Sequence, residues 1–331
     1  MSTRVRLSLL VAAFLVAALS SLMVGAHWIG PATALKGLIA PAPEAVDQLI
    51  VRSSRLPRTV VAMVVGASLA VAGALMQTLT RNPLASPGLL GINSGATFAV
   101  VLLVAWAGSA SLAAWSLGAF LGAALAAAIV WWVAMRGGTS THGPLRLVLA
   151  GAALSALFTA FSQALLVIDQ QGLDTVLFWL AGAVDGRAPS ELAPLMAVAL
   201  AAGLGCIPLT RAMNVLAAGE SMARGLGIKV HRLQALMVGL VVALSGASVA
   251  MAGNITFVGL IVPHMARRLL PADHRIFLPG CALLGATLLI VADVIGRSVA
   301  QPREIPVGVM TALIGAPMFI ALLNRQRSAH G

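Results

Sequence analysis

The stretch that decides the fold covers residues 59–79 and reads TVVAMVVGASLAVAGALMQTL. Its 21 residues carry no charged side chain. A helix needs about 20 apolar residues to cross the hydrocarbon core of a bilayer. The stretch therefore predicts a membrane-spanning helix, and similar stretches recur along the whole chain.

Ten such stretches follow one another. The eighth is short and contains Pro263, which predicts a broken or tilted helix. Nine or eleven spans are the alternatives to ten. We expect an all-α integral membrane protein with spans at about residues 7–29, 59–79, 89–108, 111–135, 145–168, 190–209, 233–252, 255–270, 276–296 and 306–323.

Composition leads to the same fold class. Of the 331 residues, 60% are hydrophobic and 9% are charged, whereas a soluble domain carries about 25% charged residues. Polar groups are therefore too few to coat an exterior that faces water. The net charge of +11 would suggest nucleic-acid binding in a soluble protein. Here the basic residues lie between apolar runs, so they indicate topology instead.

Ten spans place both termini on the same side of the membrane. With that side cytoplasmic, 14 of the 21 Lys and Arg residues lie inside and 7 lie outside, in agreement with the positive-inside rule. Arg52, Arg55 and Arg58 stand together on the outer side. The first apolar run follows Arg4 and Arg6 and exceeds the roughly 7–15 apolar residues of a signal peptide, so we expect an uncleaved first helix.

A repeated motif indicates two related halves. GASLAVAG at residues 66–73 recurs 180 residues later as GASVAMAG at residues 246–253. The copies lie in the second and seventh spans, which run in opposite directions. This predicts an inverted-topology repeat with halves at about 56–168 and 233–323, and a cytoplasmic loop at about 210–232. Chance recurrence of small residues in packed membrane helices is the alternative.

The chain has no motif for chemistry of its own. A phosphate-binding P-loop needs Gly-Lys followed by Ser or Thr, and the only lysines, Lys36 and Lys229, do not follow a glycine. No GxSxG or HExxH occurs either. We therefore expect no catalytic residue, no metal and no cofactor on this chain, with ATP hydrolysed on a separate subunit. Cys206 and Cys281 lie in apolar runs, which favours a role as small apolar fillers.

Two connections between spans carry polar residues. Residues 81–88, RNPLASPG, form either an ordinary turn or a shaped loop at the mouth of a pathway. Residues 211–232 form the longest inside connection, and residues 217–226 in it are expected to fold as short helices broken by glycines. This connection is either a solvated loop or a docking surface for a soluble partner.

Polar residues also lie within the spans. Gly151, Ser155, Thr159 and Gln163 share one face of the fifth span because they are spaced four apart. Gly308, Thr311 and Gly315 behave similarly in the tenth. Such stripes allow close helix packing or line a water-filled pathway. Asp293 and Arg297 are also four apart and predict an ion pair near the outer end of the ninth span.

Ordered motifs occur between about residues 50 and 325: RLPR at 55–58, GAS at 66–68, Gln77, NPLASPGLLG at 82–91, LAG at 149–151, WLAG at 179–182, GE at 219–220, LG at 226–227, FVGLIVPH at 257–264, LPG at 278–280, AD at 292–293 and IGAP at 314–317. In these motifs the sequence resembles the permease subunits of ABC importers for iron-siderophores, haem and cobalamin.

The resemblance implies a type II ABC importer permease in a bacterial inner membrane. Two such permeases, identical or different, would surround one pathway, with two ATPase subunits binding ATP and Mg on the cytoplasmic side and a periplasmic binding protein outside. By resemblance, Arg55, Arg58 and Arg297 would receive the binding protein, which gives the outer basic cluster a reason, since paired charges steer docking. The ATPase would dock on Ala218, Gly219, Glu220, Ser221, Arg224, Gly225, Leu226 and Gly227.

The resemblance also implies a gate and a pathway. Asn82 and Leu84 match cytoplasmic gate positions, whereas Thr139 to Pro144 depart from the pattern of the second gate segment, so no gate residue is assigned there. Rocking of the fifth and tenth spans would switch access between sides, with Ser155, Thr159, Gln163 and Thr311 lining the pathway.

Substrate and transport class leave alternatives. TLTRNPLASP at 78–87 and LGINSG at 90–95 look most like the ferric citrate and other ferric siderophore members, with haem and cobalamin as alternatives. An ion-coupled secondary transporter is the rival from another class. It would need intramembrane carboxylates, and Asp293 is the one candidate for that role.

Overall fold

The computed structural model of the chain describes residues 2–25, 27–39, 45–107, 111–136, 143–168, 176–177, 179–186, 189–301 and 303–327. Within these ranges every regular element is a helix. The helices are α1 (Thr3–Met23), α2 (Pro31–Ile39), α3 (Val46–Ile50), η1 (Val51–Arg55), α4 (Leu56–Thr80), η2 (Pro87–Leu90), α5 (Ile92–Ala107), α6 (Leu112–Met135), α7 (Gly143–Ile168), α9 (Pro189–Gly205), η3 (Ile207–Leu209), α10 (Thr210–Ala218), α11 (Glu220–Gly225), α12 (Val230–Ala252), α13 (Val258–Leu269), α14 (His274–Val299) and α15 (Val307–Arg327).

Each of the ten predicted spans coincides with one helix. These helices are α1, α4, α5, α6, α7, α9, α12, α13, α14 and α15. Seven helical stretches in the described part of the chain are long and apolar enough to cross a membrane, and α5 and α15 contribute shorter apolar segments. The eighth predicted span is α13, which has 12 residues and contains Pro263, so it is short as the sequence predicts.

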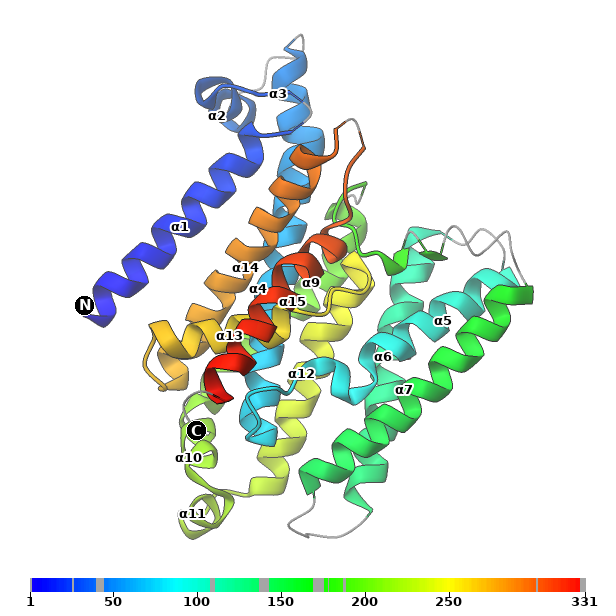
Figure 1. Cartoon of the computed structure of the whole chain (residues 1–331), viewed down its shortest axis with the longest axis vertical. Helices are drawn as coiled ribbons and strands as arrows, with labels where there is room; N and C mark the ends of the chain where they lie inside the picture. The colour runs from blue at the N-terminus through cyan, green and yellow to red at the C-terminus, as the bar shows by residue number, and fades with distance from the viewer. Residues whose placement is uncertain are drawn as a thin grey trace.

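The bundle is elongated, and its two ends differ. Figure 1 shows the short helices α2 and α3 at one end and α10 and α11 at the other, with α4 running between them. We call these the α3 end and the α11 end. Helices α5, α6 and α7 gather on one side of the bundle and α1 lies on the opposite side (Figure 1).

Helix α4 forms the centre of the bundle because it is lined with small residues. Every residue from Ser68 to Thr80 is buried. A Cβ atom on Gly66 would lie 2.3 Å from the carbonyl oxygen of Gly285 in α14, and one on Gly73 would lie 1.8 Å from that of Gly259 in α13. The backbones therefore meet directly, the arrangement that small residues permit in membrane helices.

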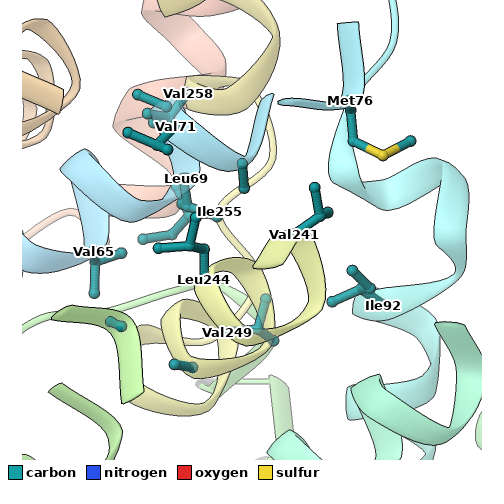
Figure 2. Close-up of a cluster of buried hydrophobic side chains, with 14 of the residues drawn as sticks. Val65, Leu69, Val71, Met76, Ile92, Val241, Leu244, Val249, Ile255 and Val258 are labelled. Carbon is teal, nitrogen blue, oxygen red and sulfur yellow. The ribbon is translucent and has the colours of Figure 1, made fainter. Parts of the chain in front are cut away.

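The remaining surface of α4 packs against α12. Val65 and Leu69 of α4 belong to the same buried apolar cluster as Leu244 and Val249 of α12, whereas Val71 lies beside Val258 of α13 in Figure 2. Apolar side chains packed in one cluster supply the dispersion contacts that hold membrane helices together, because lipid provides no hydrophobic driving force between helices.

Helices α4 and α12 run in opposite directions. Arg81, which caps the end of α4, lies 3.6 Å from Glu220, and Glu220 accepts a hydrogen bond from Gln234 in the first turns of α12. The end of α4 and the beginning of α12 therefore meet at the α11 end. This is the relation that the predicted inverted repeat requires of the helices carrying its two copies.

The peripheral helices expose apolar side chains at helical spacing. Leu117, Leu121 and Leu125 of α6 are exposed, as are Leu149 and Leu157 of α7. A face of this kind would not be stable in water, so it faces lipid or another subunit.

Candidate functional site

Four charged side chains join α4 to the α14–α15 segment at the α3 end: Arg58, Asp293, Arg297 and Glu304. We call them the α3-end cluster. Arg58 donates from Nε to both carboxylate oxygens of Asp293, at 2.8 and 3.0 Å, and also pairs with Glu304. Arg297 contacts Asp293 at 3.1 Å from one turn along α14. The predicted Asp293–Arg297 pair is confirmed, and Arg58 extends it to a second helix.

Two of the three arginines expected to face a binding protein are covered. Arg55 is 4% exposed and Arg297 is 3% exposed. Arg55 donates to the backbone carbonyls of Leu22 and His27 at 2.9 and 2.7 Å, and Arg297 donates to the Ser21 hydroxyl at 2.6 Å. The end of α1 and the turn after it therefore supply acceptors to both guanidinium groups from within the chain, although Nε of Arg297 is buried without a partner among the described residues.

Arg58 is the arginine of the three that lies nearest the surface. Its side chain is 10% exposed and that of its partner Glu304 is 43% exposed. A partner protein that approached the α3 end of this single chain would meet this pair before Arg55 or Arg297. The docking role of the three arginines stays a prediction.

At the α11 end, the predicted range 217–226 contains one short helix, α11, and the last two residues of α10, which begins earlier at Thr210. Gly219 adopts φ 141° and ψ 146°, a backbone conformation essentially restricted to glycine, and it separates α10 from α11. Gly227 has φ 77° and ends the segment. Glycine at these two positions therefore explains why one amphipathic stretch folds as two helices that project from the bundle (Figure 1).

The surface of α11 has the composition of a docking surface. Met222 and Leu226 are 55% and 65% exposed, whereas Ala223 is buried. Exposed polar and small residues surround the two apolar side chains. Of the predicted docking residues, Ala218, Ser221, Arg224, Gly225, Leu226 and Gly227 are exposed, and Gly219 and Glu220 are partly buried.

Glu220 links α11 to the end of α4 and to α12 through polar contacts. Its carboxylate pairs with Arg224 one turn along α11 at 2.8 Å and lies 3.6 Å from Arg81. It also accepts a hydrogen bond from Gln234 at 3.0 Å. The predicted docking surface is thereby linked to the segment that begins at Arg81, which contains the predicted gate residues.

The predicted gate residues lie in a compact turn after α4. Arg81 has φ 50°, and it is the one non-glycine residue with positive φ in the part of the chain that the structure describes. The side-chain oxygen of Asn82 accepts a hydrogen bond from the backbone N–H of Leu84 at 2.9 Å. Leu84 is 43% exposed, so it is free to meet another chain. Residues 139–142 of the second gate segment lie outside the described residues.

The polar stripe of α7 divides into two parts. A Cβ atom on Gly151 would lie 1.8 Å from the carbonyl oxygen of Leu89, and Ser155 accepts a hydrogen bond from Ser94 at 3.1 Å. These two positions serve close packing. Thr159 and Gln163 are exposed on this single chain. They remain the members of the stripe that can line a pathway.

The stripe of α15 faces inward. Thr311 is buried and donates to the carbonyl oxygen of Gly308. A Cβ atom on Gly308 would lie 2.3 Å from the carbonyl oxygen of Ala181, and one on Gly315 would lie 2.7 Å from Phe257. Close packing therefore explains this stripe, and in this conformation Thr311 does not reach a surface that could line a pathway.

The described residues contain no group of three or more His, Cys, Asp or Glu side chains placed to hold a metal ion.

The chain matches known permeases over nearly its whole length. The profile of the FecCD transport family covers residues 11–325. A probable siderophore transport system permease protein of Bacillus subtilis is 47% identical over 286 residues, which are 84% of this chain and 84% of the relative. An Fe(3+)-citrate import system permease protein of the same organism is 42% identical, covering 85% of this chain and 83% of the relative.

A solved structure has the same fold. It is assigned to the metal-chelate type of ABC transporter and is described in an inward-facing conformation. It superimposes with a TM-score of 0.83 at 31% identity, covering 98% of this chain and 99% of the other.

Proposed function

The chain belongs to the FecCD transport family, and from that membership we propose that it carries a ferric siderophore, of ferric citrate or similar type, across the inner membrane by alternating access. It is a membrane permease of an ABC importer of the iron-siderophore and citrate type, and a transport subunit rather than an enzyme, as its relatives are. The observation that carries the proposal is the family match over residues 11–325.

The α11 end is the cytoplasmic end in this proposal. It carries the basic connection from Arg211 to Arg232, and basic residues gather in the cytoplasmic loops of membrane proteins. The α3 end is then periplasmic, and both termini are cytoplasmic. The carboxylates of a periplasmic binding protein would approach the α3-end cluster, where charge complementarity would orient them.

An ATPase subunit would dock on the α10–α11 surface of each permease. The two ATPase subunits would hold the ATP and Mg, because this chain has no P-loop. A second permease, identical or different, would cover exposed apolar surface such as that of α7. Met222 and Leu226 are exposed apolar side chains, and their burial in an interface would be energetically favourable. They therefore support a protein contact at the α11 end.

This chain's own part in transport follows from its contacts. Movement of α11 would act through Glu220 and Arg81 on the turn that contains Asn82 and Leu84. Opening or closing that turn would change access from the cytoplasm. Thr159 and Gln163 would offer polar contacts to a hydrated cargo, which favours passage over tight binding.

The test is reconstitution of the purified permease in proteoliposomes with its ATPase and binding protein. We expect ATP-dependent uptake of iron supplied as a ferric siderophore or ferric citrate, and none without the ATPase. Uptake driven by an ion gradient in the absence of the ATPase would refute the proposal. Uptake of haem or cobalamin in place of ferric chelates would refute the substrate class while leaving the transport mechanism in place.

A further inference from the structure

A polar joint, buried at Thr78 and His274 and partly exposed at Asn214 and Asp273, connects α10 to the bundle. The side-chain oxygen of Asn214 in α10 accepts from the backbone N–H of His274 at 2.9 Å and lies 2.6 Å from the Nδ1 atom of the same residue. The amide nitrogen of Asn214 donates to Asp273 at 2.8 Å. His274 Nε2 lies 2.9 Å from the Thr78 hydroxyl in α4. We call Thr78, Asn214, Asp273 and His274 the α10 joint.

The Asn214 side-chain oxygen is an acceptor, so Nδ1 of His274 carries a proton and donates to it. The Thr78 hydroxyl lies 2.9 Å from the Ala74 carbonyl oxygen of its own helix and 2.9 Å from Nε2 of His274. In a neutral ring Nε2 is an acceptor, so the single hydroxyl proton of Thr78 is shared between these two acceptors. The backbone N–H of Arg275 and the amide of Asn214 lower the pKa of Asp273, so its carboxylate stays an acceptor at neutral pH.

The joint fixes orientation, whereas apolar contacts hold position. Met213 and Leu216 of α10 are buried and keep the helix against the bundle. Apolar packing tolerates small rotations and slides, but hydrogen bonds weaken steeply when their angles change. His274 and Thr78 are 5% and 7% exposed, so water cannot replace a bond that breaks.

Beyond the joint, α4 and α14 form one unit that reaches the other end of the bundle. Cβ atoms placed on Gly66 and Gly285 would each lie 2.3 Å from the other residue's carbonyl oxygen. At the α3 end the same two helices are tied by Arg58 and Asp293. The pair is therefore connected by polar side chains at both ends and packed backbone to backbone between them.

We propose that Asn214, His274 and Thr78 are positioning residues that transmit movement between the ATPase-docking helices and the α4–α14 pair. Through this pair, docking at the α3 end is communicated to the ATPase at the α11 end. This role rests on the function proposed above. The three residues need not contact cargo or nucleotide. Two sites are coupled when both of them shift the equilibrium of the same structural element.

The experiment compares ATP turnover of the assembled transporter, in proteoliposomes, with and without binding protein. Thr78→Val removes the hydroxyl and keeps the branched shape, whereas Thr78→Ser restores the hydroxyl. Asn214→Leu removes the joint from the α10 side. Thr287→Val is the matched control, since Thr287 lies in α14 and its hydroxyl bonds only the Leu283 carbonyl of its own helix, at 2.7 Å.

We expect Thr78→Val and Asn214→Leu to retain the ATPase and its basal turnover. The ratio of stimulated to basal turnover should fall about five-fold or more, the lower end of typical coupling between two sites. Thr78→Ser and Thr287→Val should keep the wild-type ratio.

An unchanged ratio in both joint variants overturns the inference. So does a proportional fall of basal and stimulated turnover, which is the result of a merely structural role. If Asn214→Leu fails to assemble, the comparison of Thr78→Val with Thr78→Ser decides alone. A wild-type permease that binds no ATPase overturns the proposed function, and this inference with it, so the two failures are distinguishable.

Discussion

The contact between Gly66 and Gly285 offers the sharpest test of the packing. In Gly66→Ala the new Cβ would lie 2.3 Å from the Gly285 oxygen and 2.9 Å from the Leu289 Cβ, whereas ordinary contacts begin at 3.4 Å. The two backbones must therefore separate locally by about 1 Å. A gap of about 0.5–1 Å already forfeits a quarter to a half of each dispersion contact across it. We expect a loss of stability of about 1–3 kcal/mol, the typical cost of overpacking.

The assay is thermal unfolding of the purified permease in detergent. At about 2 °C per kcal/mol for a chain of this size, Gly66→Ala should lower the apparent Tm by roughly 2–6 °C. The control is Gly239→Ala in α12, where a Cβ would meet nothing within 4 Å. There alanine should leave the Tm unchanged or raise it slightly, since glycine costs about 0.5–1 kcal/mol in a helix. Equal melting of the two variants would show that α4 and α14 are not in backbone contact.

Three further predictions concern the two ends. Asp293→Asn leaves the buried guanidinium group of Arg297 without a carboxylate and leaves Arg58 with Glu304 alone, so it should cost about 3–5 kcal/mol in unfolding measurements, while Glu304→Gln at the exposed rim should cost about 1 kcal/mol or less; equal costs would contradict the burial of the cluster. Met222→Asp combined with Leu226→Asp should abolish co-purification of the ATPase, and normal co-purification would reject the α11 surface as its docking site. Arg58→Glu should weaken binding-protein affinity most at low salt, and an affinity unchanged at low salt would count against docking at this arginine.

The helices could be predicted well from the sequence because apolar length is a local property. Each of the ten expected stretches coincides with a helix. The short eighth stretch, residues 255–270, corresponds to α13, which covers Val258–Leu269. The boundary of α5 shows the limit of the method. The predicted third span begins at residue 89, but residues 87–90 fold as the separate helix η2 and α5 begins only at Ile92, a break that hydropathy does not report.

The candidate site could be predicted only in part, since side-chain contacts depend on tertiary structure. Spacing of four predicts the Asp293–Arg297 pair, because both residues lie on one helix. No local pattern brings Thr78, Asn214 and His274 together, since they lie on three helices and are up to 196 residues apart. A polar residue in an otherwise apolar span was the one available signal, and Thr78 is too common a residue type for it to stand out.

The arginines at the α3 end show why residue identity and exposure are separate questions. Charge between two apolar runs indicates that Arg55 lies near a membrane surface, and α4 does begin there. Its exposure is decided elsewhere, by two backbone carbonyl groups, at residues 22 and 27, that accept hydrogen bonds from its guanidinium group. A buried cation needs such partners, because an unpaired one would cost several kcal/mol. Because Arg55 and Arg297 are buried against partners within the chain and Arg58 shares the rim with Glu304, a partner's carboxylates gain most by competing for Arg58.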